Sequence, residues 1–157
     1  MSLNPGNDSR WRGRILRYAP IFLWIGVIFF LSSDQGSLTQ TSRFVRPVLE
    51  FLFPGASEET LAFLHGIVRK SAHVSEYAVL AFLIVRAFGK SSVEALRKYV
   101  YLAPVALVVV VASMDEFQQS YNANRTGSAY DVLLDAAGAI GIIVFLWLIS
   151  WPRRSSD

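Results

Sequence analysis

Ionisable and amide side chains gather in three short stretches of an otherwise apolar sequence. These stretches hold Lys70, His73 and Glu76, then Asp115, Glu116 and Gln119, then Asp131 and Asp135. Helical spacing puts the members of each stretch on one broad face, since residues three or four positions apart are neighbours on a helix. Such sets can transfer protons through a histidine, bind an anionic group through a lysine, or hold a hard divalent cation through carboxylates.

The elements that carry these residues are predicted to be membrane-spanning helices. The chain has 157 residues, of which 53% are hydrophobic, and this length suits a single domain over 1–157. Four mostly apolar segments, at about 15–31, 74–88, 99–114 and 132–151, predict the spans. We therefore predict an all-α, polytopic membrane protein whose first span is an uncleaved anchor.

The connection over 32–72 contains further helical signals. An apolar stretch at 44–53 is ended by Pro54 and Gly55, and Ser57 then provides an N-cap with Glu58 and Glu59 in the following turn. These patterns predict one or two short helices lying at the membrane interface. Whether 58–88 forms one helix bent at Gly66 or two helices is left open.

The distribution of lysine and arginine predicts the orientation. One side of the predicted spans has ten of these residues, namely Arg10, Arg12, Arg14, Arg17, Arg86, Lys90, Arg97, Lys98, Arg153 and Arg154; the other has five, namely Arg43, Arg46, Arg69, Lys70 and Arg125. Positive residues accumulate on the cytoplasmic side, so both termini are predicted to be cytoplasmic. The same bias explains the net charge of +3 without a nucleic-acid partner.

This topology brings all three polar stretches to the same membrane face. A charged side chain costs about 2.5–3.5 kcal/mol at the centre of a spanning helix, so these groups are expected to turn inward and partner one another. Simpler roles compete for single residues: Asp131 can complete a capping box with Ser128, and Gly138 and Gly141 can be close-packing positions. The chain has no cysteine and two histidines, which excludes disulfides, thiolate sites and multi-histidine metal centres.

At these residues the sequence resembles the VanZ-like family of bacterial integral membrane proteins. The resemblance is carried by Lys-x-x-His-x-x-Glu-Tyr at 70–77 and Asp-Glu-x-x-Gln at 115–119, with Arg125 and Asp131 following and a further match at 31–35. It departs from the family where Gln118 replaces a frequent histidine and Asp135 a frequent asparagine. The resemblance implies the bacterial cytoplasmic membrane and an association with glycopeptide resistance, chiefly to teicoplanin, but no known reaction.

The leading functional hypothesis is a non-enzymatic module that acts on the cell envelope. Its polar site would engage an outer-leaflet lipid headgroup or a lipid-linked cell-wall precursor. Cations would bind an anionic group, while carboxylates would orient the cations and accept hydrogen bonds. The ligand-binding candidates are Lys70, Gln119, Arg125, Asp131 and Asp135.

Three alternatives are left open. A membrane enzyme would use His73 as its general acid or base, with Glu76, Asp115 and Glu116 as further catalytic candidates. A divalent cation, Mg²⁺ or Mn²⁺, would then be held by Asp115, Glu116 and Asp131. A purely structural salt-bridge network is the second alternative and a transporter the weakest, since four short spans would have to oligomerise. A homo-oligomer is also left open.

Overall fold

Helices account for nearly all of the chain in the computed structural model, which describes residues 5–33, 38–121 and 128–150. Four of them are long and apolar enough to cross a membrane: α1 (Pro5–Ser32), α3 (Glu58–Gly89), α5 (Leu102–Ser120) and α6 (Ala129–Ser150). Two shorter helices are α2 (Leu38–Leu52) and α4 (Glu94–Lys98), and no strand occurs in the described residues. The all-α prediction with four membrane helices is confirmed.

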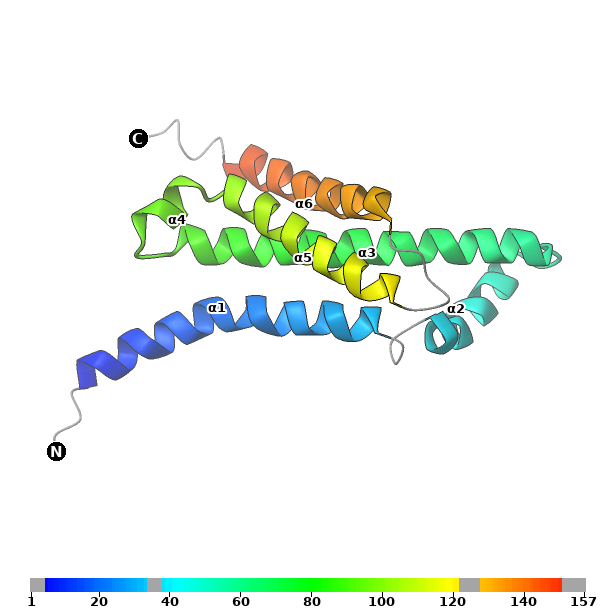
Figure 1. The fold of residues 1–157 in the computed structure, drawn as a ribbon, viewed down its shortest axis with the longest axis horizontal. Helices are drawn as coiled ribbons and strands as arrows, with labels where there is room; N and C mark the ends of the chain where they lie inside the picture. Colours follow the sequence, from blue (N-terminus) through cyan, green and yellow to red (C-terminus); the bar gives the residue numbers. More distant parts are fainter. Residues whose placement is uncertain (1–4, 34–37, 122–127, 151–157) are drawn as a thin grey trace.

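Helix α3 is the centre of the arrangement, because α1, α2, α4, α5 and α6 all contact it. Its 32 residues span about 48 Å, which exceeds the roughly 30 Å of a hydrocarbon core. In Figure 1 its first turns extend past α5 and α6, and α2 lies beside this extension. One end of the bundle, the α2 end, therefore has a projection that the other spans lack.

The sequence left open whether 58–88 is one helix or two, and the structure has a single helix. Ser57 caps it by accepting a hydrogen bond from the Thr60 amide at 3.2 Å, and Glu58 and Glu59 occupy the first turn. The helix continues through Gly66, since a single glycine costs only about 1 kcal/mol in a helix interior. Of the two expected interfacial helices, only α2 is a separate element, and Gly55 turns the chain after it with a φ of 87°.

Each of the four membrane helices extends beyond its predicted apolar stretch at one end or both, α1 from Pro5 and α3 from Glu58. Helix α5 continues to Ser120 instead of ending near 114, and α6 begins at Ala129 instead of 132. Glutamate and glutamine are good helix formers, so α5 continues beyond the end of its apolar residues. Asp115, Glu116 and Gln119 therefore lie in the last turns of α5, where their spacing fixes their directions.

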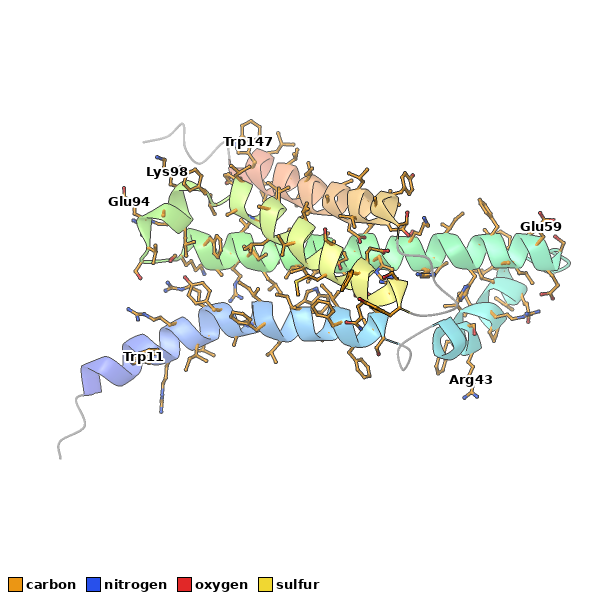
Figure 2. All side chains as sticks on the ribbon, viewed as in Figure 1. Trp11, Arg43, Glu59, Glu94, Lys98 and Trp147 are labelled. Atoms are coloured by element: carbon orange, nitrogen blue, oxygen red, sulfur yellow. The ribbon has the colours of Figure 1, made fainter. Side chains whose placement is uncertain are left out.

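The core lies along α3, and large apolar side chains also cover the outside of the bundle. Tyr77, Leu80 and Ile84 of α3 are buried, whereas Phe22, Phe117 and Leu133 are among many exposed apolar residues. Figure 2 shows side chains projecting outward from the helices, with Trp11 and Trp147 among them. An apolar exterior of this kind is expected where lipid replaces water as the solvent.

A close approach between α3 and α6 occurs at Gly138. A Cβ atom there would lie 2.6 Å from the Val74 carbonyl oxygen, which is closer than real Cβ atoms come. Gly138 is therefore a close-packing position, as expected. The same expectation for Gly141 is wrong, because a Cβ atom at that residue would meet no other helix of the described chain within 4 Å.

The first residue of α1 and the last of α6 lie at the same end of the bundle as α4 (Figure 1). We call this the α4 end. The polar stretches singled out above lie toward the opposite α2 end, where α1 and α5 end and α6 begins.

Candidate functional site

A small cavity of about 80 Å³ lies among α3, α5 and α6. Most of its lining residues are ionisable, and the full set is Gly66, Arg69, Lys70, His73, Glu116, Asp131, Leu134 and Asp135. We call it the polar cavity. It brings together side chains from all three polar stretches.

An ion pair between α3 and α6 lines the polar cavity. The Lys70 Nζ atom donates to Asp131 Oδ1 at 2.6 Å, and the ammonium also lies 5.2 Å from the centre of the Tyr130 ring. The side chains of Lys70 and Asp131 are 52% and 27% exposed, so both can be reached from outside. The cation is therefore oriented by a carboxylate while part of its surface stays available.

Glu116 takes over the role that the sequence assigned to Asp131. In a capping box the acid at the third helical position would accept the N–H of Ser128. Instead, Glu116 of α5 accepts this N–H at 2.7 Å, while the Ser128 hydroxyl accepts from the Tyr130 amide at 3.2 Å. The capping-box prediction for Asp131 is wrong, because a neighbouring helix supplies the acceptor and leaves Asp131 to pair with Lys70.

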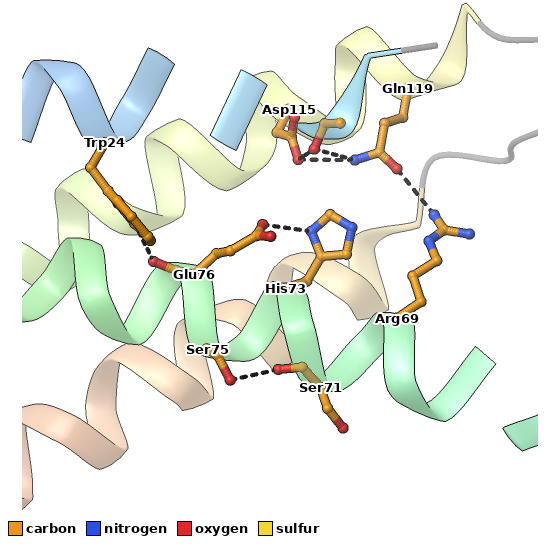
Figure 3. Close-up of polar contacts among 9 residues, drawn as sticks. Trp24, Arg69, Ser71, His73, Ser75, Glu76, Asp115 and Gln119 are labelled. Carbon is orange, nitrogen blue, oxygen red and sulfur yellow. Dashed lines mark hydrogen bonds and ion pairs between the residues drawn. The ribbon is translucent and has the colours of Figure 1, made fainter. Parts of the chain in front are cut away.

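His73 and Glu76 lie close together on α3 and form an ion pair when the imidazole is protonated. The His73 Nδ1 atom lies 3.7 Å from Glu76 Oε2, and both side chains are largely buried (Figure 3). His73 lines the polar cavity, whereas Glu76 does not. Trp24 of α1 donates its indole N–H to the backbone oxygen of Glu76 at 2.8 Å, which holds α1 against this part of α3.

A chain of hydrogen bonds beside the cavity links three helices (Figure 3). Asp115 Oδ2 accepts from the Ser32 hydroxyl of α1 at 2.8 Å and from Gln119 Nε2 at 2.9 Å. Gln119 Oε1 in turn accepts from Arg69 Nη2 of α3 at 3.3 Å. Asp115 and Gln119 are 1% and 2% exposed and do not line the polar cavity. We call Ser32, Asp115, Gln119 and Arg69 the buried network.

Sequence reasoning did not select two members of this network. In the sequence Arg69 counts only among the cations that predict the orientation, and Ser32 is not a candidate although it lies in the 31–35 segment that resembles the family. That segment was the signal that could have identified Ser32, which is 1% exposed at the end of α1.

The predicted site residues therefore divide into three groups. The polar cavity is lined by Lys70, His73, Glu116, Asp131 and Asp135, of which Asp135 is 3% exposed one turn deeper than Asp131. Glu76, Asp115 and Gln119 lie near it but outside its lining. Arg125 lies outside the described residues.

A model of a known protein family matches this sequence. The VanZ/LLP1 family model matches residues 18–150, which is most of the chain. The chain belongs to the VanZ/LLP1 family. The match includes every residue of the polar cavity and of the buried network, and it confirms the resemblance found in the sequence. No match to a curated protein and no match to a solved structure was found.

The VanZ/LLP1 chain is thus a multi-pass membrane protein whose carboxylates serve separate contacts. Among the described residues, no group of three or more His, Asp or Glu side chains is placed to hold a metal ion. Asp115 accepts hydrogen bonds from Ser32 and Gln119. Glu116 accepts one from the Ser128 amide, and Asp131 accepts one from Lys70. The arrangement therefore gives no support to the divalent cation that the enzyme alternative would place among them.

Proposed function

We propose that this VanZ/LLP1 protein binds the polar group of an outer-leaflet lipid or a lipid-linked cell-wall precursor in the polar cavity, without catalysing a reaction. The observation that carries the proposal is the Lys70–Asp131 pair, which lines the cavity and is partly exposed. An ion pair that only joined two helices would stabilise them more if it were buried away from lipid and water.

The size of the cavity restricts what enters it. A volume of about 80 Å³ holds a few water molecules or one small polar group, since one water needs about 10–15 Å³ by this kind of measure. A larger ligand would leave most of itself outside. This suits an amphiphile that inserts one polar group while its apolar chain stays in the bilayer.

The lining combines donors and acceptors. Arg69 and Lys70 can donate charge-assisted hydrogen bonds to phosphate or carboxylate oxygens, and the carboxylates can accept from hydroxyl and amide groups. A ligand that satisfies both kinds carries an anionic group next to sugar or peptide donors. Lipid-linked cell-wall precursors have this composition, which fits the link to teicoplanin resistance that the family resemblance implies.

We expect Lys70→Gln to weaken binding of a lipid-linked disaccharide-peptide precursor by tenfold or more. Losing one charge-assisted hydrogen bond costs about 1.5–3 kcal/mol, and 1.4 kcal/mol is a factor of ten. The measurement is the affinity of the purified full chain for that precursor, with phosphatidylcholine as the inert lipid. Teicoplanin susceptibility of cells carrying each variant at matched membrane levels is the second readout.

Arg43→Gln is the matched control, because Arg43 is an exposed cation of α2 at the same end of the bundle. The exchange of Lys70→Asp with Asp131→Lys separates binding from scaffolding. The exchanged pair can still join α3 to α6. We therefore expect the double variant to be more stable than either single variant, while its affinity for the precursor stays low. Unchanged precursor affinity in Lys70→Gln would show that the proposal is wrong.

Catalysis is the second candidate, and the His73–Glu76 contact favours it. His73 lines the cavity and its Nδ1 atom lies 3.7 Å from Glu76 Oε2, which is beyond hydrogen-bond length, and such contacts of a general base tighten when a substrate binds. Mass spectrometry of the precursor after incubation with the wild-type chain distinguishes binding alone from catalysis. A changed precursor mass that disappears in His73→Gln would establish catalysis and replace the binding-only function.

We also propose that the polar cavity faces the extracytoplasmic side of the bacterial cytoplasmic membrane. The excess of lysine and arginine at the α4 end supports this orientation. Because the chain has no cysteine, Glu59→Cys and Lys98→Cys can each be labelled in intact cells with an impermeant thiol reagent. We expect position 59 to react and position 98 to react only after the cells are opened; the reverse pattern would contradict the orientation.

A further inference from the structure

A second cavity, separate from the polar cavity, lies at the α4 end between α1 and α3. Its volume is about 200 Å³, and its lining is Gly13, Leu16, Arg17, Arg86, Ala87 and Lys90. Half of these residues are cations and none is an acid. We call it the basic pocket.

The cations of the basic pocket lack the acidic partners that Arg46 and Lys70 have. At the α2 end, Arg46 pairs with Glu50 and Glu58 at 2.7 and 2.6 Å. Among the side chains described, those of residues 11–33, 42–121 and 128–150, no carboxylate lies within 4 Å of Arg17, Arg86 or Lys90. Three like charges around one recess repel each other, so a bound anion would lower their energy.

The shape of the basic pocket follows from the path of α1. Pro20 lies inside α1 and cannot donate the helical hydrogen bond of its turn, which is a common cause of bending. In Figure 1 the first half of α1 slants away from α3, while its second half runs alongside. Gly13 and Ala87 add little side-chain volume, so the space that the bend opens is not filled.

Hydrogen bonds around Ser91 hold the pocket walls in place. Tyr18 of α1 lies next to the pocket residue Arg17 and donates to the Ser91 hydroxyl at 2.9 Å. Arg97 of α4 donates to the Ser91 carbonyl oxygen at 2.6 Å. Ser91 follows the pocket residue Lys90 and is itself 4% exposed. These hydrogen bonds fix the chain next to Arg17 and Lys90 and so hold α1 and the end of α3 together beside the pocket.

The surroundings identify the anion as part of a lipid. The pocket lies between two membrane-spanning helices near one end of the bundle, and its wall residue Leu16 is 73% exposed beside Ile15, which is 59% exposed. An occupant thus meets cations and an apolar helix surface together. We propose that the basic pocket binds the phosphate headgroup of an anionic membrane phospholipid, whose acyl chain lies along Leu16 and Ile15.

The test uses the purified full chain in detergent and three probes: phosphatidylglycerol, phosphatidylcholine and soluble glycerol phosphate. The pocket variant combines Arg17→Gln, Arg86→Gln and Lys90→Gln. The control variant combines Arg12→Gln, Arg14→Gln and Lys98→Gln, which removes the same charge from the α4 end outside the pocket. Native mass spectrometry or lipid titration gives the affinity of each protein for each probe.

We expect phosphatidylglycerol to bind the wild-type chain and the control in preference to phosphatidylcholine. Its affinity for the pocket variant should fall about 100-fold, since each cation near an anionic lipid contributes about fivefold. If the pocket variant does not fold, Arg86→Gln alone should lower the affinity about fivefold. Equal affinity for pocket variant and control, or no preference over phosphatidylcholine, would overturn the proposal. Displacement of the lipid by millimolar glycerol phosphate would identify a free-anion site and overturn it as well.

Discussion

Replacing Gly138 by valine is expected to separate α3 from α6. The new Cβ would lie 2.6 Å from the Val74 carbonyl oxygen and 2.8 Å from Val74 Cγ1, and the valine methyl groups would add to this overlap. Neither neighbour is a flexible side-chain end, so one helix must move. Overpacking of a well-packed interface costs about 1–3 kcal/mol, and contact with the backbone places this variant near 3 kcal/mol. Thermal unfolding of the purified protein in detergent measures the loss.

Gly141→Val is the matched control, because it makes the same substitution one turn further along α6. A Cβ atom at residue 141 meets nothing within 4 Å, so we expect less than 1 kcal/mol of change. A loss of similar size in both variants would mean that valine harms α6 by itself and that the contact with Val74 is not responsible. The lining of the polar cavity depends on this same interface, since Lys70 and Asp131 belong to α3 and α6.

The meeting of Lys70, His73, Glu116, Asp131 and Asp135 could be predicted from the sequence, because it depends mainly on topology. Three helix ends on one membrane face, each with ionisable groups on one side, leave few other places for the charges. Hydropathy was sufficient to predict the four spans. It could not show that α5 runs on to Ser120, because a hydropathy pattern records the end of the apolar run and not the end of the helix.

The pairing of individual groups could not be predicted in the same way. Asp131 had an acceptable local partner in Ser128, and only the position of α5 shows that Glu116 occupies that N–H. Ser32 contacts Asp115 because α1 is rotated so that this residue faces α5. Helix rotation is set by packing details such as the Gly138–Val74 contact, which no periodicity in a single helix reveals.

The basic pocket could not be predicted from the sequence either. Arg17, Arg86 and Lys90 are ordinary positive-inside residues when only their sequence positions are considered. The bend of α1 at Pro20 and the Tyr18–Ser91 hydrogen bond turn three of these flanking cations into the lining of one recess. A sequence-based count of charges at each membrane face cannot separate these three from Arg12, Arg14 and Lys98.

Asp115→Ala is expected to loosen the junction of α1, α3 and α5. The carboxylate accepts from Ser32 and Gln119, and its removal leaves both donors without this acceptor in a buried region. An unsatisfied buried group costs about 1–3 kcal/mol, although hydrogen bonds within membranes average less, so we expect a loss of about 2 kcal/mol. Thermal unfolding in detergent again provides the measurement.

Two further variants identify the cause of that loss. Both hydrogen bonds end on Asp115 Oδ2, and Oδ1 has no hydrogen-bond partner in the described part of the chain. Asp115→Asn can keep its amide oxygen at the Oδ2 position, so it should lose less than half as much stability as Asp115→Ala. Ser113→Ala removes a hydroxyl of the same helix that donates to the Val109 carbonyl oxygen of its own helix, and it should have little effect. If Asp115→Asn is as unstable as Asp115→Ala, the two hydrogen bonds do not account for the loss and the negative charge of Asp115 stabilises this junction.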